Sequence, residues 1–378
     1  MDYITTRELA EKWGVSVRTA NLYLNEGRVE GAVRKSGGWL APADAPKPGR
    51  RPVKAFMPIW KPYASGDSGR MIEELADEEE RCAARAAQYY FQARYDEACA
   101  EAGRCMQSAC PEIRTTALLV RGMASVPFGD PEATRRDFYA IMQEAARPAD
   151  ARMASIYEYI RFLMGVFFHH DGDGEPECPS RFDGLSEGAR LYALYAYAHA
   201  LYLRRDYARA LGVAESALTL AAGRYPSVCI YLDLVASMAA TNLARVDLAD
   251  RFFLDAWRLA EPEGYIQPFA EHHGMLQGQV EKYFRGRAPE LYERIADRVV
   301  RFSRGWIKIH NPQSVNKVTD RLTPFEFALA MMAVKGKSNR EIADYLSISV
   351  NTVKAYLSSI YQKVGVGGRG ELEQYLNR

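Results

Sequence analysis

Three helix-start signals follow closely on one another near the carboxyl end of the 378-residue chain. Thr323 and Ser338 each stand three residues before a glutamate, which is the spacing of a capping box, and Ser349 is a further capping residue. Only residues 346–349 separate the second helix from the third, which the pattern places over residues 350 to about 364. Two helices joined by so short a turn indicate a helix-turn-helix.

The third helix has two sides of different chemistry. The side predicted to pack inward consists of Val350, Val353, Leu357, Ile360 and Val364. The opposite side consists of Asn351, Lys354, Ala355, Ser358 and Gln362. Small and polar side chains with one lysine suit the major groove of DNA, because Lys reaches guanine O6 and N7 and Ala touches a thymine methyl group. The alternative is a solvated polar face on a packed bundle.

Three stretches of this region resemble the LuxR-type DNA-binding domain: residues 322–327, 336–343 and 348–366. The resemblance implies a domain over residues 321–378 whose recognition helix reads bases near Lys354. It also implies a short last helix, about Gly370 to Leu376, that dimerises. Double-stranded DNA and a second copy of the chain are therefore the expected partners. Tyr356 departs from the family, which usually has histidine at that position.

Phosphate and base contacts are expected from different parts of this region. Hydroxyl and backbone N–H groups at helix amino termini can hold phosphate, whereas the polar side of the third helix can reach base edges. The residues predicted to contact DNA are Ser338, Asn339, Ser349, Asn351, Thr352, Lys354, Ala355, Tyr356, Ser358 and Lys363.

The first helix of this region is apolar nearly all round. Phe325 falls on one stripe with Leu329, and Phe327 falls on a second stripe with Met331. Only one stripe can face the core of the domain. We expect the Phe327 stripe to dock on the middle of the chain or on another subunit; the alternative is an apolar residue left on the surface.

The amino end carries a second helix-turn-helix pattern. Thr5 and Glu8 form a capping box, Ser16 caps the next helix, and residues 32–42 read as two short strands around a Ser-Gly-Gly turn. The segment resembles the excisionase or MerR-type winged helix over residues 1–45. The residues predicted to contact DNA here are Ser16, Arg18, Thr19, Asn21, Arg34 and Lys35. A wing that docks on protein is the alternative.

Charge is spread unevenly along a chain whose total is only +1. Residues 1–61 carry 11 Lys and Arg against 6 Asp and Glu, and residues 321–378 carry 8 against 5. Basic ends suit a polyanion such as DNA, although chance variation in surface charge can give the same pattern. Proline and basic residues crowd residues 46–68, which we expect to form a semi-extended linker. A second linker is expected over residues 306–320.

The middle, residues 69–305, is predicted to be helical throughout, so the fold class is mainly α. Apolar residues with the spacing i, i+3, i+7, i+10 begin at Tyr95, Pro131, Tyr207 and Val246. Their separations of 36, 76 and 39 residues are close to one or two periods of the ~34-residue tetratricopeptide helix pair, which predicts a tetratricopeptide-like solenoid. Residues 264–274 resemble the end of the helical region in large MalT-like regulators, which implies a sensor domain.

Several residues of the middle leave more than one interpretation open. A tyrosine-rich surface could hold an aromatic or amphiphilic ligand, or these residues could serve the core: Tyr192, Tyr195, Tyr197 and Tyr202. His272 and His273 suggest packing or interaction rather than catalysis. Residues 169–178 offer carboxylates and imidazoles without a calcium or zinc spacing, so a solvated loop is favoured and no metal is expected. We expect no enzyme and no cofactor, because no nucleophile with base and acid can be identified.

Together these features predict a sequence-specific DNA-binding transcriptional regulator with a helical sensor between two DNA-binding ends. Six cysteines without a CxxC pair favour a reducing compartment, and no apolar run approaches the ~18 residues of a membrane span, so we expect a cytoplasmic protein. The signal is expected to be a small-molecule inducer or a protein, and RNA polymerase is a further candidate partner. The competing interpretation is an interaction scaffold whose helical repeats recruit partners while its end domains dock.

Overall fold

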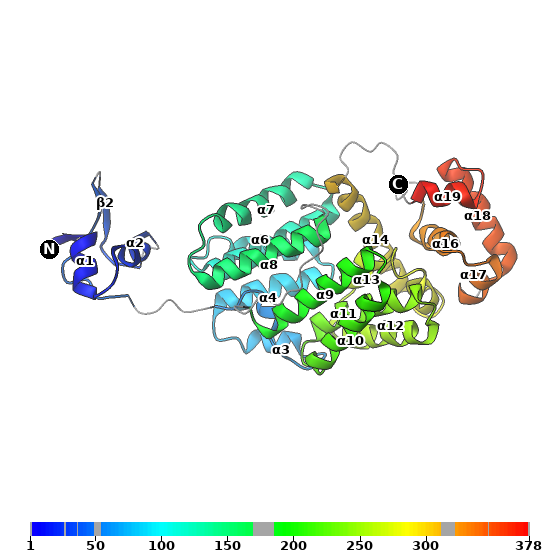
Figure 1. Cartoon of the computed structure of the whole chain (residues 1–378), viewed down its shortest axis with the longest axis horizontal. Coiled ribbons are helices and arrows are strands. Elements are labelled where there is room, and N and C mark those ends of the chain that lie inside the picture. Colours follow the sequence, from blue (N-terminus) through cyan, green and yellow to red (C-terminus); the bar gives the residue numbers. More distant parts are fainter. Residues whose placement is uncertain are drawn as a thin grey trace. The chain divides into compact units, whose positions relative to one another are not determined.

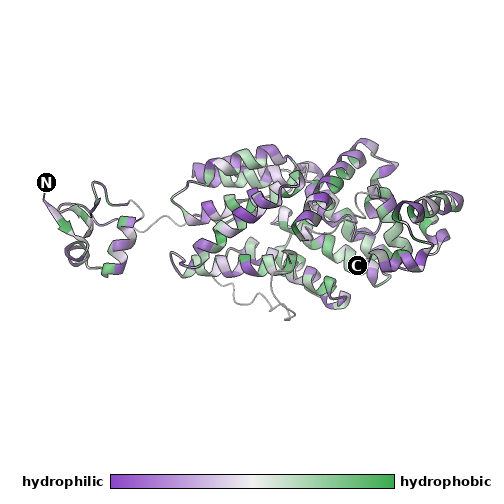
Figure 2. Cartoon of the chain, turned by 90° about the horizontal axis from the view of Figure 1, so that it is seen from above, coloured by the Kyte–Doolittle hydropathy of each residue, from purple (hydrophilic) through white to green (hydrophobic). Residues whose placement is uncertain are grey.

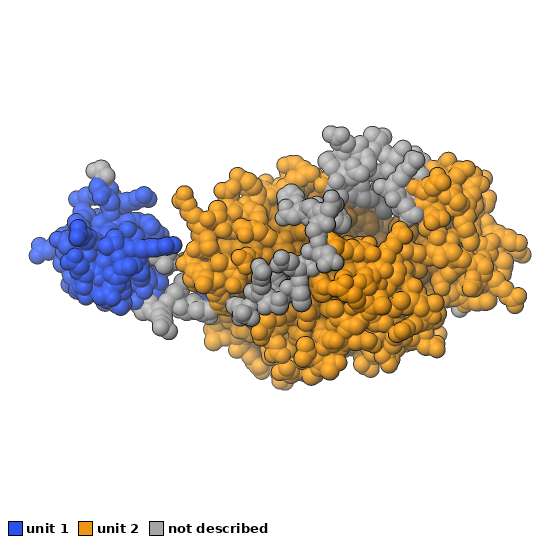
Figure 3. Space-filling model, viewed as in Figure 1, with its two compact units in different colours: residues 1–54 blue, residues 55–378 orange. Residues whose placement is uncertain are grey.

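The chain divides into two compact units, residues 1–54 and 55–378 (Figure 3). The computed structural model describes residues 2–25, 28–35, 37–48, 54–168, 185–310, 322–346 and 348–376. The elements of both units are labelled in Figure 1.

The first unit is a helix pair packed on a small antiparallel sheet. Its elements are β1 Tyr3–Thr5, α1 Thr6–Trp13, α2 Val17–Asn25, β2 Val33–Lys35 and β3 Gly38–Pro42, with strand order β1-β3-β2. The capping box of Thr5 and Glu8 is present, and Ser16 accepts a hydrogen bond from the backbone N–H of Thr19, so both predicted helix starts are confirmed. The hairpin expected over residues 32–42 is present as well.

One strand of this unit was not expected. β1 pairs with β3, with Ile4 opposite Ala41, and so adds a third strand to the hairpin. Leu9 and Trp13 turn inward as predicted, and the indole N–H of Trp13 donates a 3.2 Å hydrogen bond to the carbonyl of Ala45. The amino-terminal strand therefore holds the hairpin against α1.

The second unit begins with a body of antiparallel helices stacked side by side (Figure 1). Its helices are α3 Ser68–Glu73, α4 Glu78–Phe91, α5 Tyr95–Cys105, α6 Pro111–Ser125, α7 Pro131–Ala145, α8 Ala151–Phe168, α9 Glu187–Leu203, α10 Tyr207–Ala221, α11 Pro226–Asn242, α12 Val246–Ala260, α13 Gln267–His272 and α14 Pro289–His310. Short helical turns η1 Pro58–Trp60, η2 Val126–Phe128, η4 Glu261–Glu263 and η5 Glu281–Arg285 connect them. Below, these elements together are called the helical body.

Four helical hairpins of the body share one design: α4 with α5, α6 with α7, α9 with α10, and α11 with α12. The second helix of each pair begins at Tyr95, Pro131, Tyr207 or Val246, which is the first residue of each apolar set identified in the sequence. In each pair the residue two positions earlier has a positive φ: Ala93 (57°), Gly129 (66°), Arg205 (66°) and Ala244 (57°). Three of these turns thus use a left-handed residue other than glycine, which strains the backbone.

Hydrophobic residues fill the space between the paired helices. Figure 2 shows hydrophilic and hydrophobic residues alternating along the helices, as expected where each helix buries one side. The helix α11 is the exception, because nearly every residue from Pro226 to Ala240 is buried. It forms the centre of the body, in contact with α9, α10, α12 and α13.

The predicted linker over residues 46–68 is shorter than expected. Phe56, Ile59 and Trp60 are buried in the core of the helical body, and the backbone N–H of Met57 donates a 3.0 Å hydrogen bond to Thr116 Oγ1. Burial of these large apolar side chains stabilises the folded segment. The prolines around them prevent helix formation but do not prevent this packing. The helix α14 likewise continues to His310, through the start of the linker expected over residues 306–320.

A disulfide joins Cys82 of α4 to Cys105 of α5. The spacing of the six cysteines, which favoured a reducing compartment, did not indicate this pairing. Both residues lie on the buried sides of their helices, where the hairpin brings them together. Cys99, Cys110 and Cys229 form no disulfide bond among the described residues.

The carboxyl-terminal domain follows as four helices: α16 Pro324–Val334, α17 Asn339–Leu346, α18 Val350–Val364 and α19 Arg369–Leu376. Its core is a separate cluster of buried side chains built around Leu329, Ile342 and Ile360. The capping boxes begun by Thr323 and Ser338 are both present, and Gly365 ends α18 with a φ of 75°. The three helix starts expected from the sequence are therefore confirmed.

Candidate functional site

The helix-turn-helix of the carboxyl-terminal domain presents the polar side of α18 to solvent. Ser349 caps the helix by accepting a 3.0 Å hydrogen bond from the backbone N–H of Thr352. Val353 and Leu357 bury the apolar side against α16 and α17. The residues of the opposite side that are exposed are Asn351, Lys354, Ala355, Ser358 and Gln362. Four of the residues predicted to contact DNA thus share one open surface of the helix.

Three other predicted contacts are held by partners inside the domain. Lys363 Nζ contacts Glu326 Oε2 at 2.7 Å, and Asn339 Oδ1 accepts a 3.1 Å hydrogen bond from Arg369. The ring of Tyr356 is half-buried. It meets the ring of Phe325 edge-on, with the two centroids 4.9 Å apart. Each of these side chains stabilises the packing between helices of the domain.

Glu326 connects the start of α16 to the end of α18. Burial pushes the pKa of this carboxyl upward, but hydrogen bonds from Lys363 and from the backbone and hydroxyl of Thr323 outweigh burial and leave the pKa below its ordinary value. The carboxylate therefore serves both as the second half of a capping box and as the partner of Lys363.

The carboxyl-terminal domain rests on the helical body through Phe327. Gly274 lies so close to the Phe327 ring that a Cβ at position 274 would stand 2.7 Å from Cε1 of the phenylalanine. The predicted docking of the Phe327 stripe on the middle of the chain is confirmed. At Gly278 an added Cβ would likewise stand 3.0 Å from Met332 Cε, so two glycines four residues apart make room for α16.

Two cations of the turn η5 strengthen this contact. The guanidinium of Arg285 lies 3.7 Å from the centre of the Phe325 ring, and Lys282 Nζ lies 4.7 Å from the centre of the Tyr345 ring on α17. Cation–π contacts of this kind contribute about 0.5–2 kcal/mol each. The polar side of α18 takes no part in the contact and stays open.

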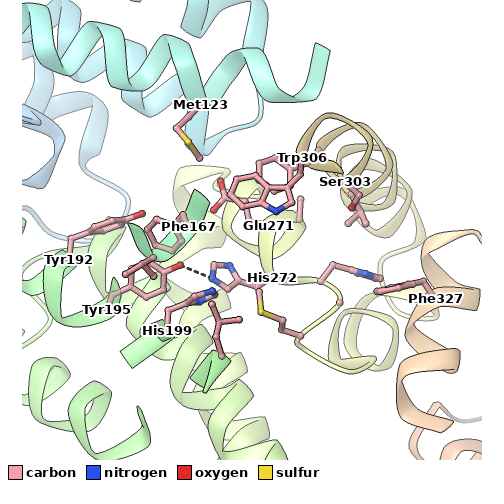
Figure 4. A pocket seen from close by; sticks show the side chains of 18 residues that line it. Met123, Phe167, Tyr192, Tyr195, His199, Glu271, His272, Ser303, Trp306 and Phe327 are labelled. Carbon is pink, nitrogen blue, oxygen red and sulfur yellow. Dashed lines mark hydrogen bonds between the residues drawn. The ribbon is translucent and has the colours of Figure 1, made fainter. Parts of the chain in front are cut away.

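A cavity of about 350 Å³ lies between α9, the segment 270–275 and α14 (Figure 4). Its walls carry the aromatic side chains Phe167, Tyr192, Tyr195, Phe302 and Trp306. Phe327 of the carboxyl-terminal domain lines the same cavity, and Figure 4 shows it on the side opposite Tyr192. One wall of the cavity therefore belongs to the domain that carries the helix-turn-helix.

Glu271 is the only carboxylate among the described residues that line this cavity. Its Oε1 accepts hydrogen bonds from Tyr90 and from Gln267 Nε2 (3.0 Å), and its Oε2 accepts one from Tyr231 (3.0 Å). Burial raises the pKa of Glu271, since these hydrogen bonds offset only part of the loss of water. The carboxyl is thus held in place by three neutral donors.

His272 stays neutral at the edge of the cavity. Its Nδ1 lies 2.7 Å from the carbonyl oxygen of Pro268, so this nitrogen carries the proton, and Nε2 accepts a 2.8 Å hydrogen bond from Tyr195 (Figure 4). Burial lowers the pKa of His272 to about 4. The histidine therefore fixes the Tyr195 hydroxyl without adding charge.

The structure separates the four tyrosines singled out from the sequence. Tyr192 and Tyr195 line the cavity, whereas Tyr197 accepts a hydrogen bond from Arg209 and Tyr202 accepts one from Asn242. Sequence reasoning missed Glu271 and Trp306. Glu271 stands directly before the two histidines in the sequence, and that polar run inside an apolar helix could have indicated it.

The residues predicted for the amino-terminal domain lie on its surface to different degrees. Arg18, Arg34 and Lys35 are exposed, and the Arg34 guanidinium lies 6.0 Å from the Trp39 ring. Thr19 and Asn21 are half-buried. The hydroxyls of Thr19 and Ser16 lie 2.8 Å apart. The exposed cations of this domain therefore lie on α2 and on the hairpin.

The segment with carboxylates and imidazoles, residues 169–178, lies outside the described residues. In the parts that the structure does describe, no three His, Cys, Asp or Glu side chains gather as metal ligands would. Likewise, none of the described helices has the length and hydrophobicity needed to cross a bilayer.

A family model described as "Bacterial regulatory proteins, luxR family" matches residues 320–376. The matched range contains α16 to α19, including the recognition helix and its capping residues. The carboxyl-terminal domain is therefore a luxR-type helix-turn-helix, the domain of a family of DNA-binding transcriptional regulators.

Proposed function

We propose that the protein is a sequence-specific transcriptional regulator that reads DNA with α18 and receives a signal through its helical body. The observation that carries this proposal is the open polar side of α18, with Lys354, Ala355 and Ser358 exposed while the domain is docked. Lysine at a groove-facing position favours guanine, and alanine favours the methyl group of thymine. The caps Ser338 and Ser349 lie at helix amino termini, where phosphate binds well.

The amino-terminal domain supplies a second DNA contact in this proposal. Arg18 on α2 and the pair Arg34 and Lys35 on the hairpin place three exposed cations on one small domain. A hairpin with two cations can follow a phosphate backbone, which adds affinity without adding sequence preference. We infer that the regulator acts as a homodimer, with α19 as the dimerising helix, and that RNA polymerase is a partner at the promoter.

The cavity of the helical body is the proposed site of the signal. Pockets for small molecules are mostly apolar with a few polar groups, and they begin at about 300 Å³. The cavity has this composition, and Phe327 connects it to the DNA-binding domain. A small molecule is therefore favoured over a protein as the signal.

The experiment that tests the proposal selects bound sites from random DNA with the full-length protein. We expect one enriched motif and a log–log salt dependence with a slope of about −0.9 for each phosphate contacted. Lys354→Ala should weaken binding to the selected site by about 1–3 kcal/mol and leave binding to random DNA nearly unchanged. Gln362→Ala is the matched control, because Gln362 is exposed further along the same helix.

Failure of this experiment has a defined meaning. No enrichment and no salt-dependent binding would reject the regulator and favour the interaction scaffold. Equal losses on both kinds of DNA would make Lys354 a phosphate contact rather than a base contact.

A further inference from the structure

The cavity between α9 and α14 has an unusual balance of charge. Six Phe, Tyr and Trp side chains form much of its wall, and among the described lining residues there is no lysine or arginine. The single carboxylate among these residues is Glu271, which is half-buried and lines the cavity beside Trp306 (Figure 4). A ligand that enters this space meets aromatic faces, the imidazoles of His199, His272 and His273, and one acidic group.

Within the part of the chain that the structure describes, no ion pair involves Glu271. Tyr90, Tyr231 and Gln267 are all neutral donors, and each holds the carboxylate in position without compensating its charge. Withdrawing a carboxylate from water disfavours its charged form unless a counter-charge reaches it. The neutral state of His272 means that the neighbouring imidazole does not supply one.

We propose that this cavity binds a small organic cation, an amine attached to an aromatic or apolar body, with Glu271 as its counter-ion and Trp306, Phe167 and Tyr192 as its aromatic walls. Aromatic faces attract cations by their quadrupole, and the attraction is stronger where the contact is shielded from water. The inference rests on the proposed function in one respect, that the helical body is the sensor. It adds the chemical class of the signal.

The same charge distribution disfavours an anionic ligand. A carboxylate or phosphate placed in the cavity would face Glu271 without any described cation to offset the repulsion. A neutral ligand of the same shape would gain the apolar contacts alone. Comparing a cation, a neutral molecule and an anion of the same shape therefore distinguishes recognition of charge from simple filling of the cavity.

Phe327 connects occupancy of the cavity to the docking of the carboxyl-terminal domain. A ligand in the cavity touches Phe327 only while α16 rests on Gly274, so it binds the docked state more tightly than an undocked one. By reciprocity, docking and ligand binding strengthen each other. The amine is thus expected to fix the domain on the body.

The experiment titrates the full-length protein with tryptamine, tryptophol and indole-3-propionate, which present the same ring system as a cation, a neutral alcohol and an anion. Binding is measured by calorimetry and by the shift of the melting temperature. We expect tryptamine to bind at least tenfold more tightly than tryptophol and indole-3-propionate not to bind. Equal binding of all three, or no binding of tryptamine at millimolar concentration, would overturn the proposal.

Matched variants locate the charge that matters. Glu271→Gln keeps the shape of the side chain and removes its charge. It should therefore lower the affinity for tryptamine about tenfold and leave the affinity for tryptophol unchanged. Glu187→Gln is the control, since Glu187 also accepts a hydrogen bond from a tyrosine, Tyr225, but lies outside the cavity. A loss of tryptamine binding in Glu187→Gln equal to that in Glu271→Gln would reject Glu271 as the counter-ion.

Phe327→Ala tests the link to docking. This substitution should lower the affinity for tryptamine about fivefold, which is at the low end of the usual range for coupling between sites. An unchanged tryptamine affinity in Phe327→Ala would reject the link and retain the site. Because none of these titrations contains DNA, they can fail while the DNA-binding experiment succeeds, and the reverse also holds.

Discussion

The ring of Phe327 lies against the backbone of Gly274, in space that any side chain at position 274 would occupy. An added Cβ would stand 2.7 Å from Cε1 of the ring. The backbone of Gly274 itself has no positive φ, so alanine there is unstrained apart from this contact. The pair therefore joins the helix-turn-helix domain to the helical body at a point that one methyl group can break.

Gly274→Ala should loosen the docking of the carboxyl-terminal domain. Calorimetry of the wild type should show the domain and the helical body unfolding together, whereas Gly274→Ala should separate a transition for the domain at lower temperature. Adding Phe327→Ala should cause little further loss, because the contact and the clash involve the same ring.

Gly212→Ala is the control for that series. Gly212 lies exposed in α10 with nothing within 4 Å of an added Cβ, so alanine should raise stability by up to about 1 kcal/mol through helix propensity. A split transition in Gly212→Ala, or an unaltered one in Gly274→Ala, would contradict the role given to the Phe327 contact.

The left-handed turn residues of the helical hairpins predict a stabilising change. Ala244 is exposed with a φ of 57°, a conformation that costs a residue with a Cβ about 1–2 kcal/mol. Ala244→Gly should remove this cost and lose about 0.4–1 kcal/mol to chain entropy, for a net gain of roughly 0.5–1 kcal/mol. Urea unfolding measures it. Ala100→Gly, at an exposed site inside α5, should instead lose about 1 kcal/mol.

His272 should make stability depend on pH. Its pKa is about 4 in the folded protein against 6.5 for the free side chain, so the unfolded chain takes up a proton in a range where the native state does not. The contribution of His272 to the free energy of unfolding is fully present above pH 6.5. It is lost as the pH falls toward 4, and the total loss is about 3 kcal/mol. His272→Gln should lower this dependence between pH 7 and 4.5, and an identical pH profile in the variant would count against the buried neutral imidazole.

Lys363 should matter for folding more than for phosphate contact. Lys363→Met would leave the nearly buried Glu326 with only its Thr323 donors, which we expect to cost roughly 1–2 kcal/mol in the stability of the domain. The salt slope of DNA binding should stay unchanged, whereas Lys354→Met should change it by at most about 0.9. A reduced slope in Lys363→Met without loss of stability would identify Lys363 as a phosphate contact instead.

The local signals of the sequence proved sufficient for the helix-turn-helix. Capping by Thr323, Ser338 and Ser349 depends on residues three positions apart, and the helix starts followed from it. The helical character of the hairpins was also predictable from the sequence, since their small and apolar residues recur at helical spacing. The docking of Phe327 on the helical body was predictable because one helix cannot turn two apolar stripes toward one core.

Features that depend on long-range packing were beyond this reasoning. The segment with Ile59 and Trp60 looked like a linker because its prolines are a local signal, whereas its burial depends on contacts with residues more than a hundred positions away, such as Ser227. The cavity is a further case. Met123, Glu271 and Trp306 come from distant parts of the sequence, and no spacing rule brings them together.

The open side of α18 in the docked state bears on the geometry of promoters. If the domain binds DNA while it stays docked on the helical body, then the body of every bound copy lies in one fixed orientation around the axis of the duplex. Moving the binding site by half a helical turn would then swing the body to the far side of the promoter, so transcription should rise and fall with the spacing between site and start point.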